Sequence, residues 1–254
     1  MPFLDHLEEL RWRIVKSLAA LGIAFSASFW VAWRYLEPVM KVLIDPIRPM
    51  LPSGGLVYTH PMGIYTIIMQ VAGLLALVVA SPVVGYQVWA FLSPALSARE
   101  RKVIVPVLAF GALLFLVGVA LAVLVFVPMT VKLGMSISVE SLTPLITAKE
   151  YFGFITIISL AFGAIFEMPI LVLILTALGL VTPSMLTKGR RWAAALSLVA
   201  AMIITPGDVV VATLALWVPI YGLYELSIVV SWFVYRARRK REAQAESIGS
   251  GAEG

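Results

Sequence analysis

Residues 103–127 read VIVPVLAFGALLFLVGVALAVLVFV, a run of twenty-five residues without a charged side chain. A helix of about 20 apolar residues crosses a bilayer core of about 30 Å, so this run is long enough to span a membrane. In lipid, only helices and closed barrels satisfy the hydrogen bonds of the backbone, and the connecting stretches lack the alternation of barrel strands. The run therefore predicts a transmembrane helix in an all-α protein.

Five further apolar runs occupy residues 14–33, 64–91, 152–180, 192–205 and 209–234. Apolar residues make up 61% of the 254 residues and charged residues only 13%, about half the share of a soluble domain. The sequence predicts a polytopic membrane protein, with a single domain of six transmembrane helices over residues 1–235. The last two are expected to be short, because residues 192–205 reach only about 21 Å and Glu225 interrupts the last run.

Lysine and arginine are concentrated in four short segments that fall on one side of the predicted membrane. These segments hold fourteen of the nineteen cations: Arg11, Arg13, Lys16, Arg99, Arg101, Lys102, Lys188, Arg190, Arg191, Arg236, Arg238, Arg239, Lys240 and Arg241. By the positive-inside rule both termini are expected to be cytoplasmic, and this topology explains the basic composition without a nucleic-acid partner. Residues 236–254 are predicted to be a disordered cytoplasmic tail.

Residues 1–13, before the first run, are predicted to form an amphipathic helix. Phe3, Leu7 and Leu10 recur at helical spacing, so this helix would lie at the inner membrane surface and continue into the first span. Glu9 and Arg13 are i,i+4 neighbours, a pair worth about 0.2–0.5 kcal/mol. The charged residues are either a solvated polar face or part of a binding site.

A second charged segment follows the second run. Pro94 ends the helix there, Trp89 and Phe91 are expected at the membrane interface, and Glu100 is flanked by cations on both sides. The segment is either a charge-balanced turn or, together with Glu9, a carboxylate pair that receives a cationic ligand.

Three acidic residues fall in or beside the later runs. Glu167 stands in mid-span, where a carboxyl costs at least about 2.5 kcal/mol, and the nearby Pro169 removes a backbone hydrogen bond and opens the helix. Glu167 has either a structural role, bonded to the opened backbone, or a functional one. The same two alternatives hold for Glu225, and Asp208 is placed to cap the last helix.

Motifs for enzymatic chemistry are missing from the sequence. Cysteine is absent, His6 and His60 are predicted on opposite sides of the membrane, and no HExxH, Gly-x-Ser-x-Gly or nucleotide-binding loop occurs. We therefore expect no enzyme activity, no metal site and no cofactor.

Five motifs follow one another along the chain: residues 6–13 (HLEELRWR), 86–96 (YQVWAFLSPAL), 99–101 (RER), 162–169 (FGAIFEMP) and 205–208 (TPGD). Together they resemble those of one family, the C subunit of the twin-arginine (Sec-independent) protein translocase, TatC, over residues 3–235. The resemblance implies a concave bundle of six helices in the cytoplasmic (inner) membrane. It also implies a core receptor that binds twin-arginine signal peptides of folded cargo, for export driven by the proton motive force.

The resemblance further implies roles for individual residues. The signal-recognition positions of the family match Glu9, Arg11, Phe91, Pro94, Leu96 and Glu100, of which Glu9 and Glu100 would receive the arginine pair. Glu167 matches a buried glutamate of the concave face, and Asp208 matches an acidic position of the extracytoplasmic turn. The implied partners are signal peptides, the single-span A/B subunits of a multimeric complex, and the lipid bilayer.

Two other interpretations stay open from the residues alone. A proton-coupled small-solute transporter would use Glu167 and Glu225 as coupling sites and would carry flux without partner subunits. A membrane scaffold without a ligand would tolerate charge reversal at Glu9 and Glu100. The receptor hypothesis requires these last two acids to lie close together on one side of the membrane.

Overall fold

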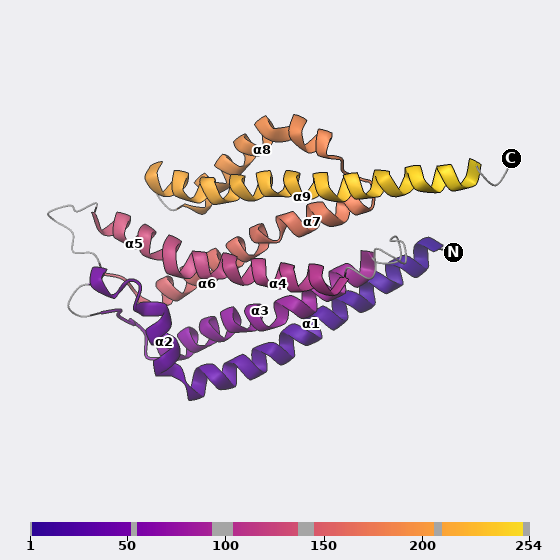
Figure 1. Ribbon diagram of the computed structural model, residues 1–254. Helices are drawn as coiled ribbons and strands as arrows, with labels where there is room; N and C mark the ends of the chain where they lie inside the picture. The colour runs from indigo at the N-terminus through magenta and orange to yellow at the C-terminus, as the bar shows by residue number, and fades with distance from the viewer. Residues whose placement is uncertain (1, 52–54, 93–103, 137–144, 206–209, 251–254) are drawn as a thin grey trace.

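The computed structural model describes residues 2–51, 55–92, 104–136, 145–205 and 210–250, and this part of the chain is almost entirely helical. Figure 1 shows a bundle of long helices that run back and forth along a common direction. In chain order the elements are α1 (Pro2–Arg34), α2 (Leu36–Ile44), the 3-10 turn η1 (Arg48–Met50), α3 (Gly63–Leu92), α4 (Ile104–Leu121), the π-helical turn η4 (Ala122–Phe126), α5 (Val127–Ser136), α6 (Ala148–Phe166), α7 (Met168–Ala177), α8 (Pro183–Ile204) and α9 (Val210–Ser250).

Five helical segments are long and apolar enough to cross a bilayer: Leu7–Arg34, Gly63–Phe91, Val107–Ser136, Ala148–Ala177 and Val210–Arg236. They correspond to the first four predicted spans and the last one, so the chain is a multi-pass membrane protein. α8 has 22 residues but does not join this group, because Lys188, Arg190 and Arg191 lie in its first half. A sixth crossing, by α8, stays a prediction.

The connections between the helices gather at two ends of the bundle (Figure 1). The start of α1, the end of α3, the α7–α8 connection and the end of α9 lie at one end. α2, the end of α5 and the start of α9 lie at the opposite end. The basic residues near the start of α1, in the first half of α8 and late in α9 therefore share one end of the molecule.

The third predicted span continues further than expected. η4 and α5 extend α4 to Ser136, nine residues beyond the predicted end of the span at residue 127. Pro128 lacks the N–H that would bond to the preceding turn, and its ring crowds the carbonyl of that turn. The wider π turn at Ala122–Phe126 relieves this conflict without ending the helix.

The last two helices are also longer than predicted. α8 begins at Pro183, nine residues before the predicted span, because the Thr182 side chain accepts a hydrogen bond from the Met185 N–H (3.4 Å) and a proline suits the first helical position. α9 has 41 residues and continues to Ser250, in place of the disordered tail predicted from residue 236. Residues 237–248 contain neither proline nor glycine and are rich in Ala, Arg, Lys, Glu and Gln, which favour helix.

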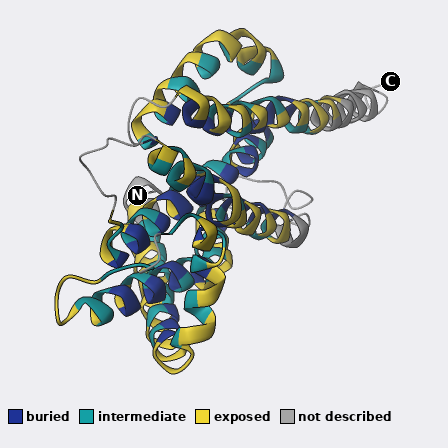
Figure 2. Ribbon diagram, turned by 90° about the vertical axis from the view of Figure 1, so that its left-hand side faces the viewer, coloured by how far each residue is buried: buried dark blue, intermediate teal, exposed yellow. Residues whose placement is uncertain are grey.

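Small residues allow α4 and α6 to pack closely. A Cβ added at Gly163 would lie 2.5 Å from Cε2 of Phe115, and one added at Gly118 would lie 2.9 Å from the carbonyl oxygen of Phe162. Helices in lipid associate by such close packing because the bilayer supplies little hydrophobic drive between them. Figure 2 shows buried residues where helices face one another and exposed residues on the outward faces.

α7 and α9 are joined by buried hydroxyl groups. The Thr176 Oγ1 and Ser231 Oγ atoms lie 2.9 Å apart, and Thr176 also donates to the Val172 carbonyl at 2.8 Å. Both side chains are fully buried, so each hydroxyl needs a partner within the protein. This contact holds α9 against the second half of the interrupted helix α6–α7.

The loops at the end opposite to the termini are tied to one another and to α6. The Val57 N–H donates to the Ile146 carbonyl at 3.3 Å, and the Ala148 N–H donates to the Val57 carbonyl at 2.8 Å. The buried Tyr151 hydroxyl of α6 donates to the Leu43 carbonyl of α2 at 2.6 Å. α2 is therefore attached to the bundle by a buried polar contact.

Tyr151→Phe is expected to lower the stability of the protein by about 1–2 kcal/mol. The substitution leaves the ring in place but deprives a buried carbonyl of its donor, which costs more than an exposed hydrogen bond would. Thermal unfolding of the purified chain in detergent measures the effect. Tyr58→Phe, at an exposed position, is the matched control and should change nothing; an equal result for both variants would contradict the role of the contact.

Candidate functional site

Glu9 and Arg13 form an ion pair near the start of α1, as the spacing predicted. The Arg13 guanidinium donates to Oε1 of Glu9 from Nη2 at 2.5 Å and from Nε at 3.1 Å. The Glu9 and Arg13 side chains are 33% and 21% exposed, so the pair is partly withdrawn from solvent but remains accessible. Arg11, two residues further on, is exposed.

The end of α3 lies beside the first turns of α1, because the two helices pack along each other in opposite directions (Figure 1). Phe91 is half-buried in the last turn of α3. Pro94, Leu96 and Glu100 lie outside the described residues, so the distance between Glu9 and Glu100 stays a prediction.

Trp89, which was predicted to lie at the membrane interface, is covered by neighbouring helices and does not face outward. It is only 3% exposed, because it packs against Val107 of α4 and against Ile170 and Ile174 of α7. The sequence shows the aromatic residue near a span end, but not which neighbours cover it. The contact fixes the end of α3 to two other helices.

A cavity of about 430 Å³ lies between α1, α3, α4, α6 and α7. Its wall is largely apolar and includes Ser17 of α1, Gly85 of α3, Gly111 of α4 and Glu167. Ser17 lies one turn after Arg13, and its hydroxyl donates to the Arg13 carbonyl at 2.9 Å. The cavity therefore begins next to the charged pair of α1 and extends to the carboxyl at the middle of the bundle.

Glu167 stands at the break between α6 and α7, as the proline two residues later predicted. The backbone groups around the break are satisfied locally: the Glu167 N–H donates to the Ala164 carbonyl at 3.3 Å, and the Ile170 and Leu171 N–H groups donate to the Glu167 carbonyl at 3.0 and 3.1 Å. The carboxyl lines the cavity instead of bonding to this opened backbone.

Gly111 provides the space that the Glu167 side chain occupies. A Cβ at this position would lie 3.1 Å from Oε2 and 3.5 Å from Oε1 of Glu167. Sequence reasoning missed Gly111 and Ser17, because the rotation of one apolar helix against another is not visible in hydropathy. For Ser17 the sequence offers one weak indication: it lies four residues after Arg13 and therefore on the same face of the helix.

Glu225 is held by two partners on the outside of the cavity. Nη2 of Arg190 on α8 lies 2.8 Å from Oε2 of Glu225, and the Tyr221 hydroxyl donates to Oε1 at 2.8 Å. The Arg190 contact links α8 to α9, and both contacts favour the structural alternative for Glu225. Asp208 lies outside the described residues, so its capping role stays a prediction.

Comparison with known proteins gives one consistent result. The sequence model of TatC, the Sec-independent protein translocase protein, matches residues 5–219. The Sec-independent protein translocase protein TatCy of Bacillus subtilis (strain 168) is 34% identical over 253 residues, which cover 99% of this chain and 96% of that protein. The corresponding TatC protein of Escherichia coli (strain K12) is 31% identical over 242 residues, which cover 95% of this chain and 92% of that protein.

The fold is similar to that of a solved structure described as the twin-arginine translocase receptor TatC in DDM. The TM-score is 0.77 at 31% identity, and the match covers 89% of this chain and 99% of that chain. Fold and site together define a multi-pass membrane protein of helices around a cavity that carries a carboxyl. The chain belongs to the TatC family. It is a Sec-independent protein translocase protein, a component of a protein-transport system.

Proposed function

We propose that this chain is the receptor and core subunit of the translocase and binds the twin-arginine signal peptides of folded cargo proteins. The observation that carries the proposal is the position of the acidic Glu9 on α1 two helical turns before Ser17, where the apolar cavity begins. Eight residues separate Glu9 from Ser17, or about 12 Å along the helix. An extended peptide with arginines followed by an apolar segment meets a carboxylate and then an apolar wall in the same order.

The chemistry of arginine makes such a site selective. Guanidinium is planar, always charged and able to bind a carboxylate through two parallel hydrogen bonds, which ammonium cannot do. Such a pair contributes about 1.5–3 kcal/mol when partly desolvated but only about 0–1 kcal/mol when exposed. Glu9, with one-third of its side chain exposed, lies between these limits. In this proposal Glu100 is the second acid, and Arg11, Phe91, Pro94 and Leu96 complete the recognition surface.

We propose that the end bearing the start of α1 and the end of α9 faces the cytoplasm at the inner membrane. The basic residues that share this end support the assignment by the positive-inside rule. Both termini are then cytoplasmic, and α8 makes the sixth crossing. In this proposal the proton motive force drives export. Single-span A/B subunits bind along α8 and α9 near Asp208, and the exposed apolar side chains of Ile203 and Val210 in this region support such a contact.

The proton-coupled transporter is less well supported. It needs two carboxyls that exchange protons along a path, but Glu225 is paired with Arg190 and bonded to Tyr221, away from the cavity that Glu167 lines. Flux of a small solute through liposomes that contain this chain alone would favour the transporter over the receptor.

Titration of a fluorescent signal peptide against the purified chain in nanodiscs tests the proposal. A peptide with two consecutive arginines is expected to bind at least about tenfold more tightly than the same peptide with two lysines, because only guanidinium binds both carboxylate oxygens. The control for general charge is the arginine-pair peptide with one lysine elsewhere in its sequence replaced by arginine. This peptide should bind as tightly as the unmodified arginine-pair peptide. Equal affinity for the arginine and lysine pairs would contradict receptor function.

A further inference from the structure

A second hollow, which we call the α8–α9 groove, lies between the first turns of α8 and the later turns of α9. It has a volume of about 440 Å³, and Ser184 and Thr187 face Val229, Trp232 and Phe233 across it. The three α9 side chains are exposed and apolar, although they belong to a segment that crosses the membrane. The groove is therefore an apolar surface at the depth of lipid chains, near the end of the bundle where α9 leaves the membrane.

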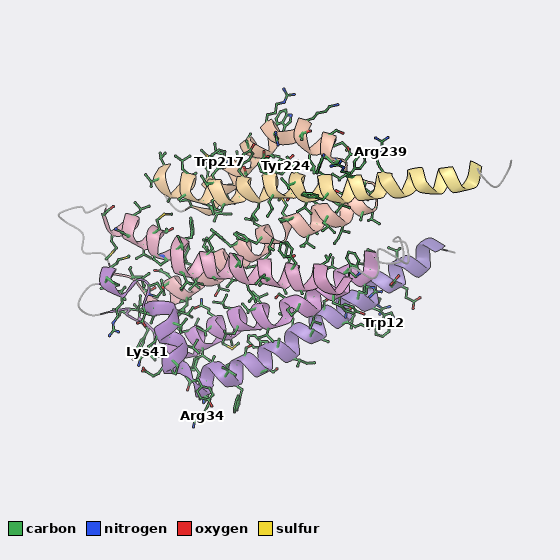
Figure 3. All side chains as sticks on the ribbon, viewed as in Figure 1. Trp12, Arg34, Lys41, Trp217, Tyr224 and Arg239 are labelled. Atoms are coloured by element: carbon green, nitrogen blue, oxygen red, sulfur yellow. The ribbon has the colours of Figure 1, made fainter. Side chains whose placement is uncertain are left out.

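Two arginines follow the groove on α9. The Arg236 Cζ lies 5.0 Å from the centroid of the Trp232 ring, and the Arg239 Cζ lies 5.9 Å from that of the Tyr235 ring. Both arginines are exposed, and the ion pairs among the described residues use Arg13, Arg48 and Arg190 instead. Figure 3 shows the Arg239 side chain on the side of α9 that faces α8. The aromatic rings hold the guanidinium groups beside the groove and leave their N–H groups for an anion.

α8 adds two further cations near the same groove. Lys188 and Arg191 are exposed and lie four and seven residues after Ser184, a spacing that keeps them on the helix face of that groove residue. Unlike Arg190, which binds Glu225, they take part in no ion pair within the described chain. Because α8 runs inward from the end of the bundle where α9 leaves the membrane, these two cations lie on the inner side of the groove, and Arg236 and Arg239 alone mark its outer end.

The order of apolar and charged residues along α9 fits one kind of ligand. Arg236 and Arg239 lie four and seven residues beyond Trp232, or about 6 and 10 Å further toward the end of the helix. A phospholipid has the same order, with an acyl chain in the bilayer core and a phosphate just outside it. Clusters of lysine and arginine directly beyond a membrane span favour anionic lipids, and tryptophan prefers the headgroup level.

We propose that the α8–α9 groove binds an anionic phospholipid, with an acyl chain along Val229, Trp232 and Phe233 and the headgroup phosphate at Arg236 and Arg239. Two observations favour a lipid over an acidic protein segment: the positive charge matches a phosphate, and the groove lies at the depth of lipid chains. An acidic protein segment would bind the cations alone and would not need the apolar groove beside them. The site is separate from the cavity of Glu167 and does not depend on signal-peptide binding.

Fluorescence quenching by brominated lipids tests the site. The full chain is reconstituted in phosphatidylcholine nanodiscs that contain a minor share of either brominated phosphatidylglycerol or brominated phosphatidylcholine. The signal of Trp232 is the difference between the chain and its Trp232→Phe variant. Phosphatidylglycerol is expected to quench this signal at several-fold lower content than phosphatidylcholine, and the preference should weaken as salt is added.

The double variant Arg236→Gln/Arg239→Gln is expected to reduce this preference about fivefold or more, since each cation near the membrane surface attracts anionic lipid. Lys41→Gln/Lys132→Gln removes the same charge from exposed positions at the other end of the molecule and should keep the preference (Figure 3 labels Lys41). Equal quenching by both lipids, or a preference that survives the loss of both arginines, would overturn the proposal. A third result would also overturn it: the chain shows no preference for phosphatidylglycerol, but loses another translocase subunit when Arg236 and Arg239 are replaced. The two arginines would then bind a protein and not a lipid.

Discussion

Gly118→Ala is expected to lower the stability of the chain by about 2 kcal/mol, and thermal unfolding in detergent should occur about 4–8 °C lower. The added methyl group would lie 2.9 Å from the Phe162 carbonyl oxygen and 2.9 Å from Cγ of Phe166. The first of these atoms belongs to the backbone of α6, so α4 and α6 must move apart. Gly163→Ala should act in the same direction, with a smaller effect if the Phe115 ring rotates away.

The control for this prediction is another helical glycine. A Cβ at Gly73 in α3 meets no atom within 4 Å, so Gly73→Ala should be neutral or stabilising by up to about 1 kcal/mol, as alanine favours helix. A Gly118→Ala variant as stable as Gly73→Ala would show that the α4–α6 contact has room for a methyl group. Because this interface positions Gly111 against Glu167, a loosened interface should also reduce signal-peptide binding.

Long apolar helices are well predicted from the sequence, whereas contacts between them are not. The run at residues 64–91 corresponds to α3 within one residue at each end, because a 20-residue apolar segment has few alternatives in lipid. The break at Glu167 was predicted for a local reason, the missing N–H of Pro169. Local chemistry and hydropathy act over one or two turns and can be read from one chain.

The remaining features depend on how helices rotate against each other. Helix α4 is apolar on all sides, so no periodicity marks Gly118 and Gly111 as contact positions. The start of α8 was predicted too late, because Lys188 and Arg191 interrupt the apolar run that defined the fifth span. Both residues nevertheless favour helix, and α8 begins before them. Of the candidate site, the Glu9–Arg13 pair was predicted from spacing, but the cavity that connects it to Glu167 is assembled from five helices and has no local signal.

Glu100→Gln is expected to weaken the binding of a twin-arginine signal peptide tenfold or more, equivalent to at least about 1.4 kcal/mol. The amide keeps the size of the side chain but removes the charge, and the flanking cations Arg99 and Arg101 would then repel the peptide. Glu9→Gln should have a comparable effect, because it also leaves Arg13 without the carboxylate that neutralises it. Fluorescence anisotropy with the purified chain in nanodiscs measures each affinity.

Glu37→Gln makes the same change at an exposed position of α2, at the opposite end of the bundle, and should leave the affinity unchanged. The comparison with a lysine-pair peptide separates recognition from general attraction: both substitutions should reduce the advantage of arginine over lysine, not merely lower both affinities together. If the two glutamates bind one arginine pair, the double variant should lose less than the sum of the single losses, since each single loss already disrupts the shared site. Strictly additive losses would mean that Glu9 and Glu100 act at separate places, and a wild-type affinity in Glu100→Gln would remove that residue from the site.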